Sequence, residues 1–125
     1  MEKINIIDIK LPDYNKVHRG DPGEELIVTF RIGDDKFRCV YIQEHYIYCG
    51  MPGVSGEQCS FSKIERGEVK STIVCNGEFR IPHDKNLVAA AYADNPYYGN
   101  DPRFLLADEE TVRKYLIEPF VKRYY

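Results

Sequence analysis

The chain contains no tryptophan, and glutamine occurs only at Gln43 and Gln58. No apolar run approaches the ~18 residues that a membrane-spanning helix needs. The first residues also lack the charged-then-apolar layout of a secretory signal. We therefore expect no membrane segment and, by default, a cytoplasmic location. The scarcity of thermolabile amides beside many charged residues is a mild thermophile-like signature.

The spacing of the four cysteines does not fit structural zinc. Cys39, Cys49, Cys59 and Cys75 are separated by 9, 9 and 15 other residues, whereas zinc sites take paired ligands from one tight turn. Buried thiols acting as small hydrophobic groups are the favoured interpretation. A disulfide between Cys39 and Cys59, or between Cys49 and Cys75, stays open as an alternative.

Motifs of phosphate and acyl-transfer chemistry are also missing. Segment 50–57 has three glycines and one proline, but it lacks the Gly-Lys-Ser/Thr ending of a P-loop and the second glycine of a nucleophile elbow. His18, His45 and His83 show no metal-binding or catalytic spacing. No family resemblance is apparent. We expect no cofactor and do not favour an enzyme, and the alternative is a small enzyme that pairs His45 or His83 with a carboxylate.

The bulk composition describes an ordinary globular chain. Its 125 residues suit a single domain spanning 1–125 with one core, and 43% of them are hydrophobic and 30% charged. The net charge of −3 lowers the expectation of nucleic-acid binding, because that affinity comes from counterion release by an excess of Lys and Arg.

Alternating apolar residues predict strands in the first half of the chain. An isoleucine-rich strand covers 3–11, and a hairpin joins 25–32 to 36–43 through a turn at 33–35. An apolar run follows at 45–49, after a bend or bulge near Glu44. Segment 50–57 is predicted to be a loop, because its glycines and proline cannot hold a central strand.

The middle of the chain predicts a three-stranded meander. Arg66-Gly67 and Asn76-Gly77 read as two-residue turns between strands at 58–65, 68–75 and 78–82. We expect the register that places Cys59 opposite Val74 and puts Cys59 and Cys75 on opposite faces. One apolar face then gathers six residues, namely Cys59, Phe61, Thr72, Val74, Phe79 and Ile81.

A C-terminal amphipathic helix over 108–125 completes the predicted fold. Asp108 is its expected N-cap, and Pro119 is expected to kink or break it. The apolar stripe that docks on the sheet comprises Val112, Tyr115, Leu116 and Phe120. The segment between Asp84 and Asp94 fits a short helix or a buried strand. The predicted class is α+β, with six to seven short, mostly antiparallel strands and this helix.

Loop 94–103 is the candidate ligand site. Adjacent tyrosines beside amide, carboxylate and guanidinium groups are typical of binding pockets. The candidate ligand-binding residues are Asp94, Asn95, Tyr97, Tyr98, Asp101 and Arg103. Asp94 and Asp101 could also hold calcium, although their spacing matches no EF-hand.

These features favour a non-enzymatic binding module that presents loops 50–57 and 94–103 to a protein or a small molecule. An exposed edge strand could pair two copies into a homodimer. A nucleic-acid binder is the further alternative, because Lys122, Arg123, Tyr124 and Tyr125 combine cations with stacking rings at the end of the helix.

Overall fold

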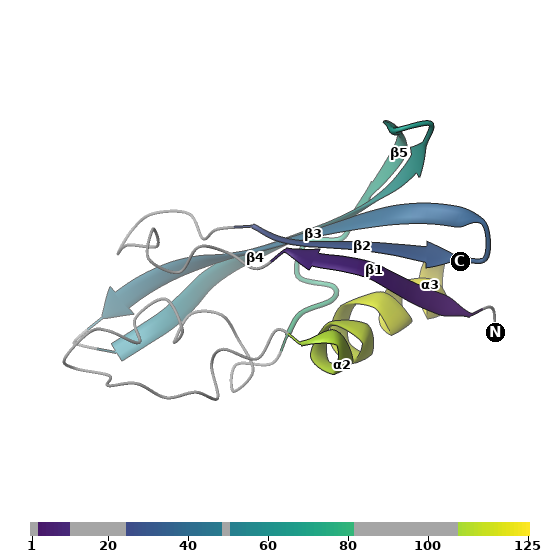
Figure 1. Ribbon diagram of the computed structural model, residues 1–125. Helices are drawn as coiled ribbons and strands as arrows, with labels where there is room; N and C mark the ends of the chain where they lie inside the picture. The colour runs from purple at the N-terminus through teal and green to yellow at the C-terminus, as the bar shows by residue number, and fades with distance from the viewer. Residues whose placement is uncertain (1–2, 11–24, 49–50, 82–107) are drawn as a thin grey trace.

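The computed structural model describes residues 3–10, 25–48, 51–81 and 108–125, with the side chains of 43–48 and 51–57 outside that description. Five antiparallel strands form one sheet in the order β1-β2-β3-β4-β5, and the C-terminal helix lies against one face of it (Figure 1). The α+β class is confirmed, with five strands in the described parts of the chain instead of six to seven. The strands are β1 (Ile4–Lys10), β2 (Leu26–Ile32), β3 (Asp35–Tyr48), β4 (Met51–Glu65) and β5 (Glu68–Val74).

The β2–β3 hairpin forms as its alternation predicts. Ile32 pairs with Asp35 across a two-residue turn. Gly33 occupies the first turn position with φ of 59°, a backbone region that glycine adopts without a steric cost. The apolar residues at every second position of both strands therefore share the face that the helix covers.

Residues 51–57 are not a loop but the first half of β4, which corrects the prediction for 50–57. Glu44 pairs with Gly56 and His45 with Val54, so a bulge leaves Ser55 without an opposite residue. This part of β4 has no described strand on its other side, because β5 reaches only as far as Ser60. Proline and glycine are unfavourable in a central strand, but both are tolerated at the edge of a sheet. The expected bulge near Glu44 is confirmed.

A second bulge changes the register of the β4–β5 hairpin. Arg66 and Gly67 have φ of 54° and 78°, and Glu65 pairs with Glu68, so the predicted turn is confirmed. Beyond Val69, however, Lys70 has no opposite residue, and the pairs become Ser60 with Val74 and Phe61 with Ile73.

The predicted register is therefore wrong past the bulge. The extra residue reverses the orientation of everything that follows it in β5. Val74 is 66% exposed, whereas Cys75 is buried on the same side as Cys59. Thr72 is likewise exposed, while the other four members of the predicted apolar face are buried.

No strand forms at 78–81, in contrast to the prediction for 78–82. Asn76 and Gly77 occupy a turn closed by the Glu78 N–H and the Cys75 carbonyl, and only Gly77 has positive φ. That pattern resembles a type II turn. Such a turn directs the two flanking segments away from each other, so they do not pair as a hairpin. The Ile81 N–H finds its partner in the buried Tyr41 hydroxyl at 3.1 Å instead of a strand.

The C-terminal helix consists of α2 (Glu109–Val112), a π-helical turn (Arg113–Ile117, η4) and α3 (Glu118–Tyr124). Asp108 caps it by accepting from the Thr111 N–H at 2.8 Å, as predicted. The helix does not break at Pro119. The π turn directly before it lets the Glu118 N–H reach the Arg113 carbonyl. A wider turn relieves the clash that a proline ring makes with the carbonyl four residues earlier.

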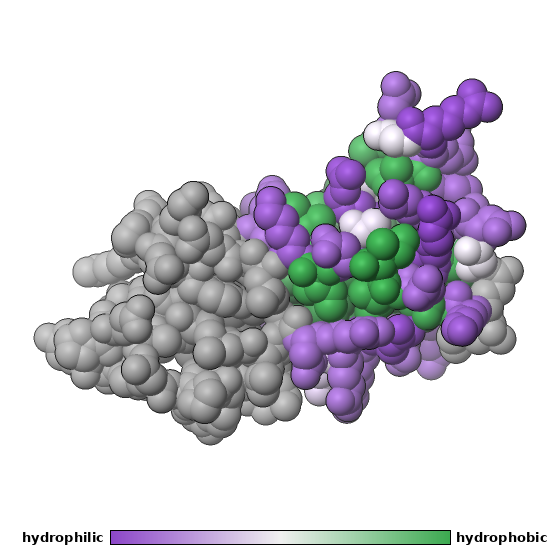
Figure 2. Space-filling view, viewed as in Figure 1, coloured by the Kyte–Doolittle hydropathy of each residue, from purple (hydrophilic) through white to green (hydrophobic). Residues whose placement is uncertain are grey.

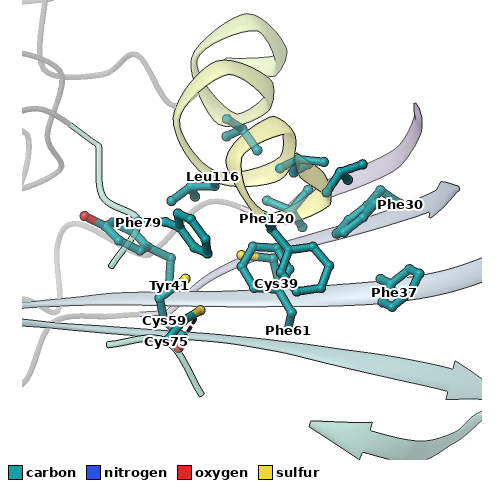
Figure 3. Packing of buried hydrophobic residues seen from close by; sticks show 14 of the residues in the cluster. Phe30, Phe37, Cys39, Tyr41, Cys59, Phe61, Cys75, Phe79, Leu116 and Phe120 are labelled. Atoms are coloured by element: carbon teal, nitrogen blue, oxygen red, sulfur yellow. Dashed lines mark hydrogen bonds between the residues drawn. The ribbon is translucent and has the colours of Figure 1, made fainter. Parts of the chain in front are cut away.

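The core lies between the helix and the sheet (Figure 3). Phe61 and Phe120 stack with centroids 3.9 Å apart, and Tyr115 packs partly buried against the same cluster. The stripe predicted for the helix therefore docks on the sheet as expected. The full buried cluster contains Ile4, Leu26, Val28, Phe30, Ile32, Phe37, Cys39, Tyr41, Cys59, Phe61, Cys75, Phe79, Ile81, Val112, Leu116, Ile117, Phe120 and Val121.

Candidate functional site

The ligand site predicted at loop 94–103 lies outside the described residues, as do the segment 84–94 and the side chains of the three histidines. The structure therefore neither assembles nor separates Tyr97, Tyr98 and their neighbours. The prediction for loop 94–103 remains a prediction. Among the described residues, no group of three His, Cys, Asp or Glu side chains is placed to hold a metal ion.

The basic, tyrosine-ended tip of the helix is bound to the sheet side of the molecule. The Tyr124 hydroxyl donates to Glu78 at 2.8 Å, and Arg123 forms an ion pair with the same carboxylate. The Tyr125 hydroxyl donates to Asp35 at 2.7 Å. These exposed contacts hold the last turn of the helix against Glu78 and Asp35. The nucleic-acid alternative remains a prediction.

The described thiols are structural. Cys39, Cys59 and Cys75 are free and buried, and the Cys75 thiol donates to the Cys59 carbonyl at 3.5 Å (Figure 3). Burial, followed by the proximity of Cys59, raises the pKa of Cys75 to about 12. A thiol that stays protonated is a poor nucleophile and a poor metal ligand, which applies to Cys75. Cys39 and Cys59 agree with the buried-thiol interpretation through their burial.

The face of the sheet opposite the helix, which we call the outer face, carries ordered rows of side chains. Residues opposite each other on neighbouring strands project to the same face. One row runs through Ile27, Val40, Ser60 and Val74 on β2 to β5. We call this the apolar row. Its first three members are half-buried and Val74 is exposed.

Polar rows flank the apolar row towards the two hairpin turns. In the next row Arg38 lies opposite Thr29 and Ser62, and the Ser62 and Thr72 hydroxyls share a hydrogen bond of 2.9 Å. In the row beyond it, Arg31 lies opposite Lys36, and Lys36 opposite Ile64. The outer face therefore changes from aliphatic to strongly basic along the strand direction.

The two edge strands, β1 and β5, differ in how readily another strand can pair with them. On β1, a bulge at Ile7 interrupts the pairing with β2, and Arg113 donates to the Ile4 carbonyl at 3.1 Å. Figure 2 shows a hydrophobic strip over β1, where Ile7 is 48% exposed. A bulge and a capped carbonyl discourage pairing with another strand. On β5, the uncharged run 71–74 follows its bulge without such a cap among the described contacts.

Sequence reasoning missed Val74 as a surface residue. The alternation in β2 and β3 was sufficient to place Ile27 and Val40 on the outer face. Val74 depends on the bulge at Lys70, and a lysine in an alternating strand gives no sign of one.

Comparisons with known proteins give no further assignment. No family model matches the chain, and neither a curated protein nor a solved structure is significantly similar to it. In the described part of the chain, no helix is long and apolar enough to cross a membrane.

Proposed function

We propose that this protein is a non-enzymatic binding module whose outer sheet face contacts a protein partner. The observation that carries the proposal is the apolar row, in which Ile27, Val40 and Val74 are aliphatic and Ser60 is the polar member, and which ends at Val74, 66% exposed on an edge strand. Burying aliphatic surface contributes about 25 cal/mol per Å², so such a row favours association.

The surroundings of the row support a protein partner. Arg38, Ser62 and Thr72 lie beside it in the next row, and an apolar centre with a polar rim containing arginine is the common anatomy of protein interfaces. The open edge of β5 adds unpaired main-chain groups within the described part of the sheet, which an extended segment of a partner can use.

A site-specific cross-linking experiment tests the proposal. A photoreactive amino acid at position 74 is compared with the same amino acid at position 122 on the exposed end of the helix. Partners captured only through position 74 are then purified and titrated with the protein. We expect Val74→Glu to weaken binding at least about tenfold, equivalent to 1.4 kcal/mol.

Val69→Glu is the matched control, because Val69 is also exposed on β5 but pairs with Ile64, outside the apolar row. Equal losses from both variants, or equal capture from positions 74 and 122, would refute the proposal. Sedimentation of the free chain tests whether the partner is a second copy. Alanine at Tyr97 and Tyr98 in the same titration tests whether loop 94–103 adds contacts.

A further inference from the structure

A hollow of about 450 Å³ lies between the β2–β3 turn and the β4–β5 turn. Figure 1 shows the β4–β5 hairpin rising away from the β2–β3 turn, and Figure 2 shows hydrophilic residues gathered on it. The hollow is within the size range of small-molecule sites. Its lining consists of Arg31, Asp34, Lys36, Ile64, Glu65, Arg66 and Gly67.

Three cations line this hollow, and none of them is paired with a carboxylate of the described residues. No ion pair or hydrogen bond joins the side chain of Arg31, Lys36 or Arg66 to another described residue, although such contacts are resolved elsewhere, as in Lys63 with Asp35 and Glu65. Arg31 and Lys36 are also directly opposite each other on β2 and β3. Like charges in that position destabilise a sheet, so a bound anion would relieve their repulsion.

The base of the hollow is formed by a buried residue. Ile64 is buried to 7% exposure, yet it lies outside the cluster between helix and sheet. It projects to the outer face opposite Lys36. Long cationic side chains shield such a residue with their aliphatic stems and leave their charged groups at the rim.

The two carboxylates of the lining are in different situations. Glu65 already lies 3.8 Å from the ammonium of Lys63, whereas Asp34 is exposed in the β2–β3 turn. Lys63 and Glu65 flank Ile64 on β4, so their side chains project to the helix side of the sheet. Asp34 is then the carboxylate at the rim, and three cations against one carboxylate give the hollow a net positive charge. A carboxylate at the rim accepts hydrogen bonds from hydroxyl groups. The lining therefore contains cations that can bind an oxyanion and a carboxylate that can bind hydroxyl groups of the same ligand.

We propose that this hollow binds a small phosphate ester that also carries hydroxyl groups. Arg31 and Arg66 supply planar donor forks that match phosphate oxygens, and Lys36 adds a point charge. Asp34 accepts a hydrogen bond from a hydroxyl group of the ester. This site is separate from the apolar row, and the inference does not depend on the proposed protein-binding function.

The test is a titration of the isotope-labelled protein followed by amide NMR, with inorganic phosphate, glucose 6-phosphate and glucose as probes. Ionic strength is held constant with chloride. We expect saturable shifts at the amides of Gly33 and Gly67 with both phosphates, tighter binding of glucose 6-phosphate, and no shift with glucose.

A double variant and a matched control separate the site from general electrostatics. Arg31→Gln with Lys36→Gln is expected to weaken binding at least about tenfold, with the dispersed amide spectrum of the folded protein retained. Lys114→Gln with Lys122→Gln removes the same charge from the helix and leaves binding unchanged. Absence of saturable shifts with either phosphate, or equal weakening by both double variants, would overturn the proposal.

Discussion

The ring of Phe61 on β4 lies parallel to the ring of Phe120 on α3, with centroids 3.9 Å apart and planes 8° apart. The two residues are 1% and 2% exposed. Phe79 meets Phe61 edge-on with centroids 6.2 Å apart. This stack therefore connects the middle of the sheet with the helix and with the irregular segment after β5.

Removing either ring of the stack should destabilise the fold strongly. Phe120→Ala is expected to lower the free energy of unfolding by about 3–5 kcal/mol, because it leaves a cavity between helix and sheet. Urea unfolding measures the change. A double-mutant cycle with Phe61→Ala should give a coupling of about 0.5–1.5 kcal/mol, and strictly additive losses would contradict the importance of the stack.

The opposed cations at the end of the sheet predict a gain in stability when one is neutralised. Arg31→Gln should raise the free energy of unfolding by about 0.2–1 kcal/mol in chloride buffer, because it removes the repulsion with Lys36. Arg38→Gln is the control, since Arg38 lies opposite Thr29 and Ser62. A loss of stability in Arg31→Gln would show that the pair is not repulsive in the absence of ligand.

The Cys75 thiol predicts a loss of stability at alkaline pH. Its pKa is raised from 9.0 to about 12 in the folded protein, so the unfolded chain loses this proton first. The contribution is constant below pH 9 and falls by about 1.4 kcal/mol per pH unit between pH 9 and 12. Urea unfolding of the native chain and of Cys75→Ala should diverge in slope across that range, and parallel slopes would refute the assignment.

The last residue of the chain is expected to control the ionisation of Asp35. The Tyr125 hydroxyl bond, followed by Lys63, holds the pKa of Asp35 below its ordinary value of 3.8. This contribution to stability is present above pH 3.8 and disappears as the pH falls through the lower folded pKa. Tyr125→Phe should raise the pKa of Asp35 in a carbon-detected NMR titration.

Tyr124→Phe provides the matched control, because the Tyr124 hydroxyl donates to Glu78 and not to Asp35. It removes the same hydroxyl one residue earlier in the helix. An equal rise in the pKa of Asp35 in both variants would show that fraying of the helix end, and not the hydrogen bond, causes the shift.

Local chemistry made much of the fold predictable. Asp108 was recognisable as a cap, and Arg66-Gly67 as a turn, because each depends on a few neighbouring residues. The helical stripe through Leu116 and Phe120 was readable for the same reason. These elements and the alternation in β2 and β3 were enough to obtain the α+β class and the side of the sheet that the helix covers.

The predictions that were wrong concern features that depend on contacts between residues distant in sequence. Segment 51–57 is a strand because β3 extends far enough to pair with it, which its own glycines did not indicate. Asn76-Gly77 does not start a hairpin, since the Asn76 side chain accepts from the Cys59 N–H at 2.9 Å. The basic hollow is lined by residues of two hairpins that are distant in sequence, so no single segment could have revealed it.

Because Lys70 is an extra residue in β5, the number of residues between Gly67 and Val74 determines which face of the sheet Val74 and Cys75 occupy. Because side chains alternate along a strand, an insertion or deletion of one residue between Gly67 and Val74 would turn Val74 inward and Cys75 outward. A change of two residues would keep both orientations. Any divergent form of this chain that retains the buried thiol and the outward valine can therefore vary this hairpin only in even steps.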